Sequence, residues 1–266
     1  MEYKLPNPLI LLSNDDGIFA PGLYALYEQM CRLGEVKVVA PDSEQSAVGH
    51  AITLRNPLRA FTWMRDGKIF GTAVIGTPAD CVKLALADFV DRAPDLLVSG
   101  INQGTNTGVD ILYSGTVSAA TEGAVNRIPS IAVSLASYQY FDFSAAAKFS
   151  YEIAAKVLEK GLPIGTFLNV NVPPLPEDKI KGVKWTRQGL SRYVERFDKR
   201  IDPKGRPYYW MDGDKIVEQT NGCTDDNALK QNYISVTPIH YDLTDKDFLQ
   251  KVTDWKFEMC NQTDFL

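Results

Sequence analysis

The chain of 266 residues is 45% hydrophobic and 23% charged, which is typical of a globular protein with a sizeable core and argues against disorder. Its formal net charge of -5 disfavours binding to nucleic-acid polymers, because attraction to their phosphates requires a basic surface, although a small anion can still bind where a cation or backbone amides supply positive potential. Its four cysteines are widely scattered without a Cys-x-x-Cys pair, so the sequence indicates neither a disulfide framework nor a structural zinc site.

The first predicted elements are a strand, a helix and a second strand. The apolar run at 9–12 is followed by a polar turn sequence, SNDDG, which is typical of a buried strand ending in a turn. The run is too short for a signal peptide or a membrane span, so we expect a cytoplasmic protein without a membrane partner. Pro21 suits the first turn of a helix over 21–33, which Gly34 closes, and the apolar segment 36–40 predicts the second strand.

The middle of the chain continues this alternation after one insertion. The segment 51–75 is rich in Thr, aromatic residues and Arg around Asp66-Gly67, which predicts a β-hairpin. Thr77 has the chemistry of an N-cap and Pro78 that of a first helical residue, so a helix is expected to about residue 90. A third strand is expected at 95–99.

Four further segments complete the predicted core. A small-residue helix near 117–125, a strand at 131–135, an amphipathic helix at 145–160 and a strand at 167–172 follow in order. Strands alternating with helices are typical of a parallel sheet covered on both faces. We therefore predict a three-layer, Rossmann-like α/β fold with a mostly parallel sheet over residues 1–175, which would carry the functional site.

Residues 176–266 have a different character and predict a β-rich extension. Turn signals at 203–205 and 212–213 indicate hairpin arms within 184–232. A returning strand at 233–238 and a last helix near 246–255 follow. Such arms often make subunit contacts or cover a site, although a surface insertion without either role is an open alternative.

Asp15 and Asp16 are the most informative residues of the sequence. They follow the first strand, and open α/β sheets bind ligands at the carboxyl ends of their strands. Two adjacent carboxylates repel each other, so the pair is stable mainly when solvent, a proton or a cation offsets the charge. Ordinary turn or N-cap chemistry is the alternative interpretation.

Three further loops follow strands of the same predicted sheet. The loop PDSEQSAVGH offers Ser43 and Ser46, and the loop SGINQGTN offers Asn102 and Asn106. The loop at Ser114, Gly115 and Thr116 opens a helix whose N–H groups could hold a phosphate, with ordinary capping as the alternative. Carboxylate, hydroxyl and amide oxygens beside an anion pocket favour metal-assisted hydrolysis of a phosphate ester. Two histidines are too few for a histidine-rich two-metal site.

These loops resemble the SurE survival-protein family of metal-dependent 5'/3'-nucleotidases. The matching stretches run in the family's order over essentially the whole chain: SNDDGIFAPG, VVAPDSEQSAVGH, GTPADCV, DLLVSGINQGTNTG, YSGTVSAATEGA and SVTPIHYDLTD. Where many members have Gly after YSGTV, this chain has Ser118, whose side chain could narrow the pocket slightly.

The resemblance implies roles for individual residues. Asp15 and Asp16 would be the catalytic aspartates and, with Ser46 and Asn102, would hold one divalent cation per subunit, Mg or Mn. Asn14, Asn106 and the loop of Ser114, Gly115 and Thr116 are similar to the family's phosphate contacts. The resemblance also implies that an activated water hydrolyses nucleoside monophosphates to nucleoside and phosphate, and that the protein is a homodimer or homotetramer.

Other functions are weighed against this one. A non-catalytic nucleotide- or metal-binding module would use the same polar loops without turnover. A dinucleotide-binding protein is disfavoured by the missing G-x-G-x-x-G turn, and a serine hydrolase by the missing G-x-S-x-G elbow. Direct attack by Asp15 or Asp16 on phosphorus is a closer competitor. His240 could shuttle protons, but a structural or surface role is the preferred interpretation.

Overall fold

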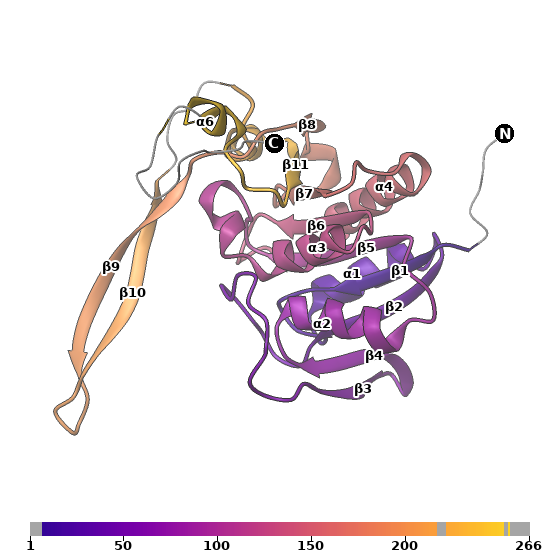
Figure 1. Ribbon diagram of the computed structural model, residues 1–266, viewed down its shortest axis with the longest axis horizontal. Helices are drawn as coiled ribbons and strands as arrows, with labels where there is room; N and C mark the ends of the chain where they lie inside the picture. Colours follow the sequence, from indigo (N-terminus) through magenta and orange to yellow (C-terminus); the bar gives the residue numbers. More distant parts are fainter. Residues whose placement is uncertain (1–6, 217–221, 253–254, 256–266) are drawn as a thin grey trace.

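The computed structural model describes residues 7–216, 222–252 and 255 and contains one dominant sheet (Figure 1). This sheet has nine strands in the order β3-β4-β2-β1-β5-β6-β7-β11-β8. Their bounds are β1 Leu9–Ser13, β2 Glu35–Pro41, β3 Arg59–Arg65, β4 Lys68–Ile75, β5 Leu96–Gln103, β6 Ser130–Leu135, β7 Thr166–Val172, β8 Val183–Trp185 and β11 Ile234–His240. Among the described residues of this sheet, the β3–β4 and β7–β11 pairs are antiparallel and the other pairs are parallel. The predicted α/β fold with a mostly parallel sheet is confirmed.

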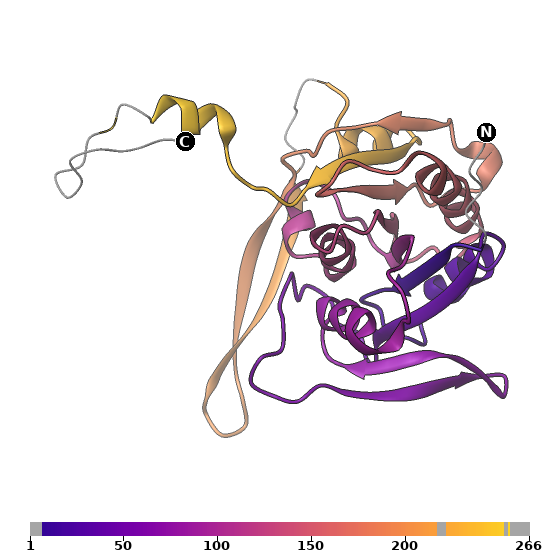
Figure 2. The same ribbon diagram turned by 45° about the vertical axis from the view of Figure 1, so that its right-hand side comes forward.

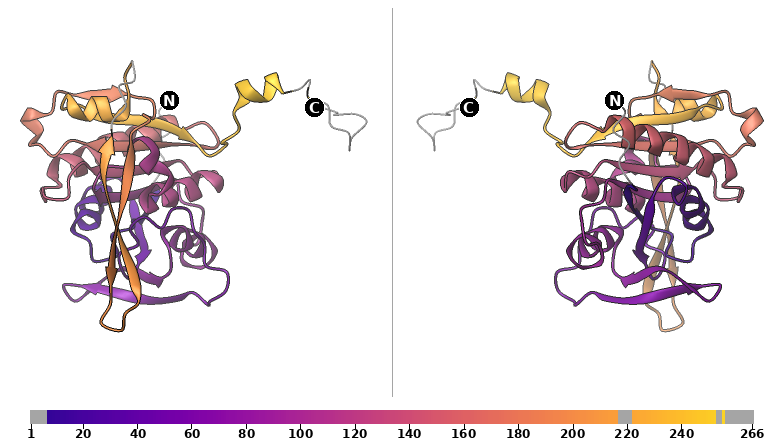
Figure 3. Two further views of the ribbon diagram at one scale, coloured as in Figure 1. Left: turned by 90° about the vertical axis from the view of Figure 1, so that its left-hand side faces the viewer. Right: turned by 90° about the vertical axis from the view of Figure 1, so that its right-hand side faces the viewer.

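Helices cover both faces of the sheet, as the edge-on views in Figure 3 show. On one face, α1 (Pro21–Met30) and α4 (Ser144–Lys160) pack over the largest core cluster, which includes Ile10 and Leu12 of β1. On the other face, α2 (Pro78–Leu84) and α3 (Gly115–Val125) pack over a second cluster that includes Leu11. Successive residues of a strand point to opposite faces of the sheet. Because helices cover both faces over β1, side chains that point either way are buried, and its successive core residues are all apolar.

Local chemistry fixes where several elements begin. The hydroxyl of Thr77 accepts a hydrogen bond from the backbone N–H of Asp80, and the Asp80 carboxylate accepts one from the N–H of Thr77, which together form a capping box at the start of α2. A π-helical turn, η1 (Ala85–Phe89), carries α2 close to the predicted end at residue 90. In the turn between α1 and β2, Gly34 lies so close to the carbonyl of Pro8 that a Cβ atom on Gly34 would be 2.1 Å from the carbonyl oxygen. A side chain is therefore excluded there.

The predicted hairpin turns at Asp66-Gly67 and belongs to the main sheet. Its second strand, β4, pairs in parallel with β2, and β3 forms the sheet edge. The strand predicted at 95–99 is longer in the structure, because β5 continues to Gln103 after a register shift between Ser99 and Asn102. Asn102 and Gln103 are therefore attached to the rigid end of a central strand.

A separate two-stranded hairpin projects from the body of the molecule (Figures 1 and 2). It consists of β9 (Arg192–Ile201) and β10 (Pro207–Ile216), and its predicted turn at 203–205 is present. The turn predicted at 212–213 is wrong, because Gly213 lies within β10 opposite Glu195. A Cβ atom at Gly213 would lie 2.7 Å from the carbonyl oxygen of Val194, so this glycine permits close strand approach rather than a turn.

The rest of the extension partly rejoins the core. A short helix, α5 (Asp225–Lys230), was not predicted, whereas the predicted returning strand is β11, which pairs with β7. The last described helix is α6 (Lys246–Lys251), and residues 253–254 of the longer predicted helix lie outside the described residues. Because β8 and β11 join the main sheet, the extension and the core share one sheet. No helix among the described residues is long and apolar enough to cross a membrane.

Candidate active site

Four loops meet at the carboxyl end of β1, as the sequence predicts. The side chain of Asp15 accepts a hydrogen bond of 2.5 Å from the hydroxyl of Thr116 at the start of α3. Asp16 accepts one of 3.2 Å from the backbone N–H of Gln103 at the end of β5. The carbonyl of Asp15 accepts a bond from the N–H of Gln45 in the loop after β2. Parallel strands place their carboxyl ends at one edge of the sheet, which explains why the segments that carry Asp15, Gln45, Gln103 and Thr116 converge here.

Asp15 is held tightly and is almost inaccessible, with 5% of its surface exposed. Burial raises the pKa of its carboxyl, the hydrogen bonds from Thr116 lower it, and the charge of Glu44 raises it further. Gly115 lies directly against it, since a Cβ atom there would lie 2.7 Å from Cβ of Asp15. The first residue of α3 must therefore be small for Asp15 to keep this position.

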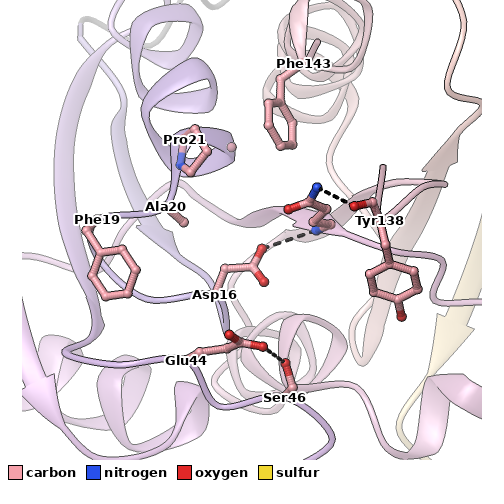
Figure 4. Close-up of a pocket in the computed structure, with 10 residues that line it drawn as sticks. Asp16, Phe19, Ala20, Pro21, Glu44, Ser46, Tyr138 and Phe143 are labelled. Carbon is pink, nitrogen blue, oxygen red and sulfur yellow. Dashed lines mark hydrogen bonds between the residues drawn. The ribbon is translucent and has the colours of Figure 1, made fainter. Parts of the chain in front are cut away.

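Asp16 faces a cavity of about 240 Å³ and is only partly buried (Figure 4). Burial and then the charge of Asp15 raise the pKa of its carboxyl to about 7, against an ordinary value of 3.8. Two neighbouring carboxylates that resist ionisation in this way would be stabilised by a cation. This is the charge arrangement expected of a site that binds a hard divalent ion.

Ser46 lies below Asp16 in the same cavity (Figure 4). Its hydroxyl donates a hydrogen bond of 2.5 Å to the carboxylate of Glu44, which also lines the cavity. Because the proton of Ser46 is directed to Glu44, lone pairs of its oxygen remain for a cation. Glu44 was not singled out from the sequence, although it lies two residues before Ser46.

Asn14 precedes Asp15 in the chain and Asn102 precedes Gln103, whose N–H bonds Asp16, but neither asparagine lines the cavity that contains Asp16. Asn102 is 8% exposed, and its amide nitrogen donates to the carbonyl of Gly104, a bond that does not use the amide oxygen. The amide nitrogen of Asn14 donates to the carbonyl of Gly17, while its buried oxygen has no hydrogen-bond partner in the structure. Unpartnered buried acceptors are rare, and a cation or a water would satisfy this one.

The donor set fits a hard divalent cation through oxygen atoms of mixed type. Among the residues that the structure describes, no group of three or more His, Cys, Asp or Glu side chains has metal-binding geometry. A cation here would therefore depend on Ser46 and Asn102 in addition to the two carboxylates. Such hydroxyl, amide and carboxylate oxygens suit Mg²⁺ and Mn²⁺ better than softer ions.

The predicted phosphate contacts have other partners in this structure. The side-chain nitrogen of Asn106 donates to Ser134, and its backbone bonds to Asn169 and Asn171, so Asn106 belongs to a buried polar network. Ser114 caps α3 by accepting from the N–H of Val117. The hydroxyl of Thr116 is used by Asp15. None of the three lines the cavity that contains Asp16.

Comparison with known proteins shows to which family this chain belongs. A family model described as "Survival protein SurE" matches residues 10–195, well over half of the chain. This chain belongs to the SurE family. It is 52% identical to the "5'-nucleotidase SurE" of Syntrophobacter fumaroxidans over 92% of this chain and 98% of that protein, and 51% identical to the one of Moorella thermoacetica over 92% and 94%.

A solved structure also supports the SurE fold. The protein is similar to the structure titled "Crystal Structure of Sure Protein from Aquifex aeolicus", with a TM-score of 0.80 and 45% sequence identity. The match covers 92% of this chain and 98% of that chain. The resemblance to the SurE family and the α/β fold predicted from the sequence are both confirmed.

In this SurE family member, the C-terminal extension holds the loop that follows Asn102. Lys215 at the inner end of β10 donates 2.8 Å hydrogen bonds to Thr107 and Asp110, and Thr107 in turn donates to Asp226. The N–H of Gly108 donates to Asp225. Burial lowers the pKa of Lys215, but hydrogen bonding with Asp110 and the charges of Asp226 and Asp110 raise it overall, so the ammonium stays charged. No local sequence pattern indicates this connection.

His240 lies at the end of β11, away from these contacts. Its Nδ1 accepts a hydrogen bond from the N–H of Asp242, and its ring stacks on Tyr241 with centroids 5.1 Å apart. Its Nε2 lies so close to Gly165 that a Cβ atom there would be 2.5 Å away. These contacts suit a structural group at the surface.

Proposed function

We propose that this protein is a metal-dependent 5'/3'-nucleotidase that hydrolyses nucleoside monophosphates to nucleoside and phosphate. The observation that carries the proposal is the pair of neighbouring carboxylates, Asp15 and Asp16, whose pKa values are raised where one of them faces an open cavity. The name 5'-nucleotidase, carried by relatives about 50% identical over nearly the whole chain, supports the substrate class.

In this proposal the chain provides a cation site and keeps its ligands in place. Asp15, Asp16, Ser46 and Asn102 would hold one divalent cation, Mg or Mn, with Asp15 and Asp16 as the catalytic carboxylates. When bound, such a cation polarises a phosphoryl oxygen and makes a water a better nucleophile. Thr116 fixes the carboxylate of Asp15, and the backbone of Gln103 fixes that of Asp16. Glu44 orients the hydroxyl of Ser46.

The N-terminus of α3 would contribute to phosphate binding less directly than the sequence suggests. Because Ser114 and Thr116 bond within the protein, their side chains would have to change partners to touch a phosphate. The backbone amides of the first turn and the helix dipole favour an anion without such a change. Asn14, Asn106 and Gly115 stay candidate phosphate-site residues by resemblance, with Gly115 leaving room beside Asp15.

A metal-by-substrate screen tests the proposed function. Purified protein is incubated with a panel of 5'- and 3'-nucleoside monophosphates and Mg²⁺, Mn²⁺ or EDTA, and released phosphate is measured. We expect release that depends on a divalent cation and is largely lost in Asp16→Asn. Release that survives complete chelation would refute the metal-dependent reaction. Nucleotide binding without any release would instead identify a non-catalytic nucleotide-binding module.

We further propose that the protein is a cytoplasmic homodimer or homotetramer, and the projecting hairpin supports the oligomer. Large apolar side chains are exposed along both of its strands, including Phe197, Trp210 and Met211, which are each at least 60% exposed. Exposed apolar surface of this kind is typical of protein–protein contacts. Light scattering on the full chain and on the variant Phe197→Asp with Trp210→Asp would show whether the oligomer depends on the hairpin.

A further inference from the structure

The cavity beside Asp16 has two chemically different sides (Figure 4). Asp16, Glu44 and Ser46 line one part with oxygen atoms. Phe19 and Phe143 contribute aromatic carbon, and Tyr138 lies on the side of Asp16 opposite Phe19. The polar part belongs to the proposed cation site. The aromatic part has no use in cleaving a phosphate ester, so it must serve the remainder of the substrate or the fold.

Phe143 has a structural role, because it is 6% exposed and belongs to the core cluster over which α1 and α4 pack. Tyr138 differs, since 71% of its surface is exposed although it lines the cavity. Its loop follows β6, the neighbour of β5 in the sheet, so Tyr138 comes from the same sheet edge as the carboxylates.

The ring of Tyr138 lies against Gly104, where an added Cβ atom would be 2.5 to 2.7 Å from three atoms at the hydroxyl end of the ring. The side-chain amide of Gln103 donates a hydrogen bond of 3.2 Å to the carbonyl of Tyr138. The backbone of Tyr138 is thus hydrogen-bonded to Gln103, whose own backbone N–H bonds Asp16. The side chain lines the cavity and stays largely exposed.

Building on the proposed nucleotidase activity, we propose that Tyr138 is the stacking platform for the nucleobase, while the phosphate of the same substrate lies at Asp16. A largely exposed aromatic ring that lines the cavity suits stacking with a planar base, because stacking adds affinity without depending on the hydrogen-bond donors and acceptors of the base. The amide of Gln103, which lines the cavity next to Tyr138, can add a hydrogen bond to the nucleoside.

Phe19 is the competing platform on the other side of Asp16. It is 48% exposed, and its ring is also close to a glycine, Gly17, at 3.0 Å from an added Cβ atom. Tyr138 is favoured because its ring is the more exposed of the two and because Gln103 supplies a polar group beside it. The two assignments predict different variants to lose base recognition, so they can be separated.

The test compares substrates that differ only in the base. Phosphate release from AMP and from ribose 5-phosphate is measured with Mn²⁺ for wild type, Tyr138→Ala, Tyr138→Phe and Phe19→Ala. Tyr113→Ala is the matched control, because Tyr113 is also an exposed tyrosine (58%) but does not line the cavity. We expect Tyr138→Ala to lower kcat/KM for AMP on the order of tenfold and that for ribose 5-phosphate less than twofold. Tyr138→Phe should keep the wild-type ratio.

A binding measurement separates this inference from the proposed activity. Calorimetric titration with adenosine, which has no phosphate to hydrolyse, should show about tenfold weaker binding to Tyr138→Ala than to wild type. If wild type hydrolyses neither phosphate ester, the nucleotidase proposal fails, but the adenosine titration still tests whether Tyr138 binds the base. The inference is overturned if Tyr138→Ala changes both substrates equally, if adenosine affinity is unchanged, or if Phe19→Ala causes the base-specific loss instead.

Discussion

Replacing Asp16 by Asn should stabilise the metal-free protein at alkaline pH. The substitution keeps the shape of the side chain and an oxygen that can accept the N–H of Gln103, but it removes the charge. Burial and the charge of Asp15 raise the pKa of Asp16 to about 7 from 3.8. The native state therefore holds a proton between about pH 4 and pH 7 that the unfolded chain has released. Its stability falls across this interval as pH rises.

The size of the effect follows from the pKa difference. Each pKa unit corresponds to about 1.4 kcal/mol, so the shift sets an upper limit of about 4 kcal/mol above pH 7. Because the carboxylate faces the cavity, solvent screens part of its charge. We expect Asp16→Asn to raise the free energy of unfolding by about 2 kcal/mol at pH 8 and by almost nothing at pH 4.

Urea unfolding followed by circular dichroism in EDTA, at several pH values and one protein concentration, measures this difference. Asp66→Asn is the matched control for the loss of one carboxylate, because the side chain of Asp66 is 90% exposed in a turn. Added Mn²⁺ should then stabilise wild type but not Asp16→Asn, which reverses their order. A variant that is less stable than wild type at pH 8 in EDTA, or a gain that is the same at pH 4, would refute this account of the carboxylate pair.

Three other substitutions test individual contacts. Lys215→Met leaves largely buried carboxylates without their ammonium partner and should lower the free energy of unfolding by about 3 kcal/mol in urea titrations, whereas exposed Lys199→Met should not. Burial alone would raise the pKa of Glu122, but its hydrogen bonds lower this pKa to about 2. The ionised carboxylate therefore stabilises the fold above pH 4.5, and this stabilisation is lost as pH falls toward 2. Glu122→Gln should have a free energy of unfolding about 1 kcal/mol lower than wild type at pH 7 and equal to it at pH 2. Gly115→Ala forces a methyl group against Asp15, so phosphate release should fall at least tenfold while the melting temperature changes by only a few degrees; unchanged turnover would show that the position of Asp15 is not critical.

Several features of the site were predictable because they depend on local sequence. The apolar run before Asp15 and Asp16 defines a buried strand, and ligands bind beyond the carboxyl ends of such strands. The same rule predicts a site at the loops that carry Ser46 and Asn102, of which Ser46 lines the cavity with Asp16. It applies equally to the loop after β6, which carries Tyr138 and was not among the loops predicted to form the site.

Other features depend on contacts between residues that are distant in the sequence, and local sequence patterns do not reveal them. Gly213 has the composition of a turn with Asp212 but lies in a strand, since β9 supplies a partner for each residue of β10. Asn106 looks available in its polar loop, yet Ser134 and residues of β7 take up its hydrogen bonds. Lys215 lies 105 residues from the aspartate to which it bonds.

The sequence by itself determined the order of strands and helices over residues 9–172, the caps of α2 and α3, and the position of the two acidic residues at a strand end, because periodicity, capping and turn chemistry act over a few residues. Only the tertiary structure decided which polar side chains face the cavity and which satisfy one another inside the protein. Each buried donor or acceptor must find a partner, and that partner is selected by the packing of segments far apart in the chain.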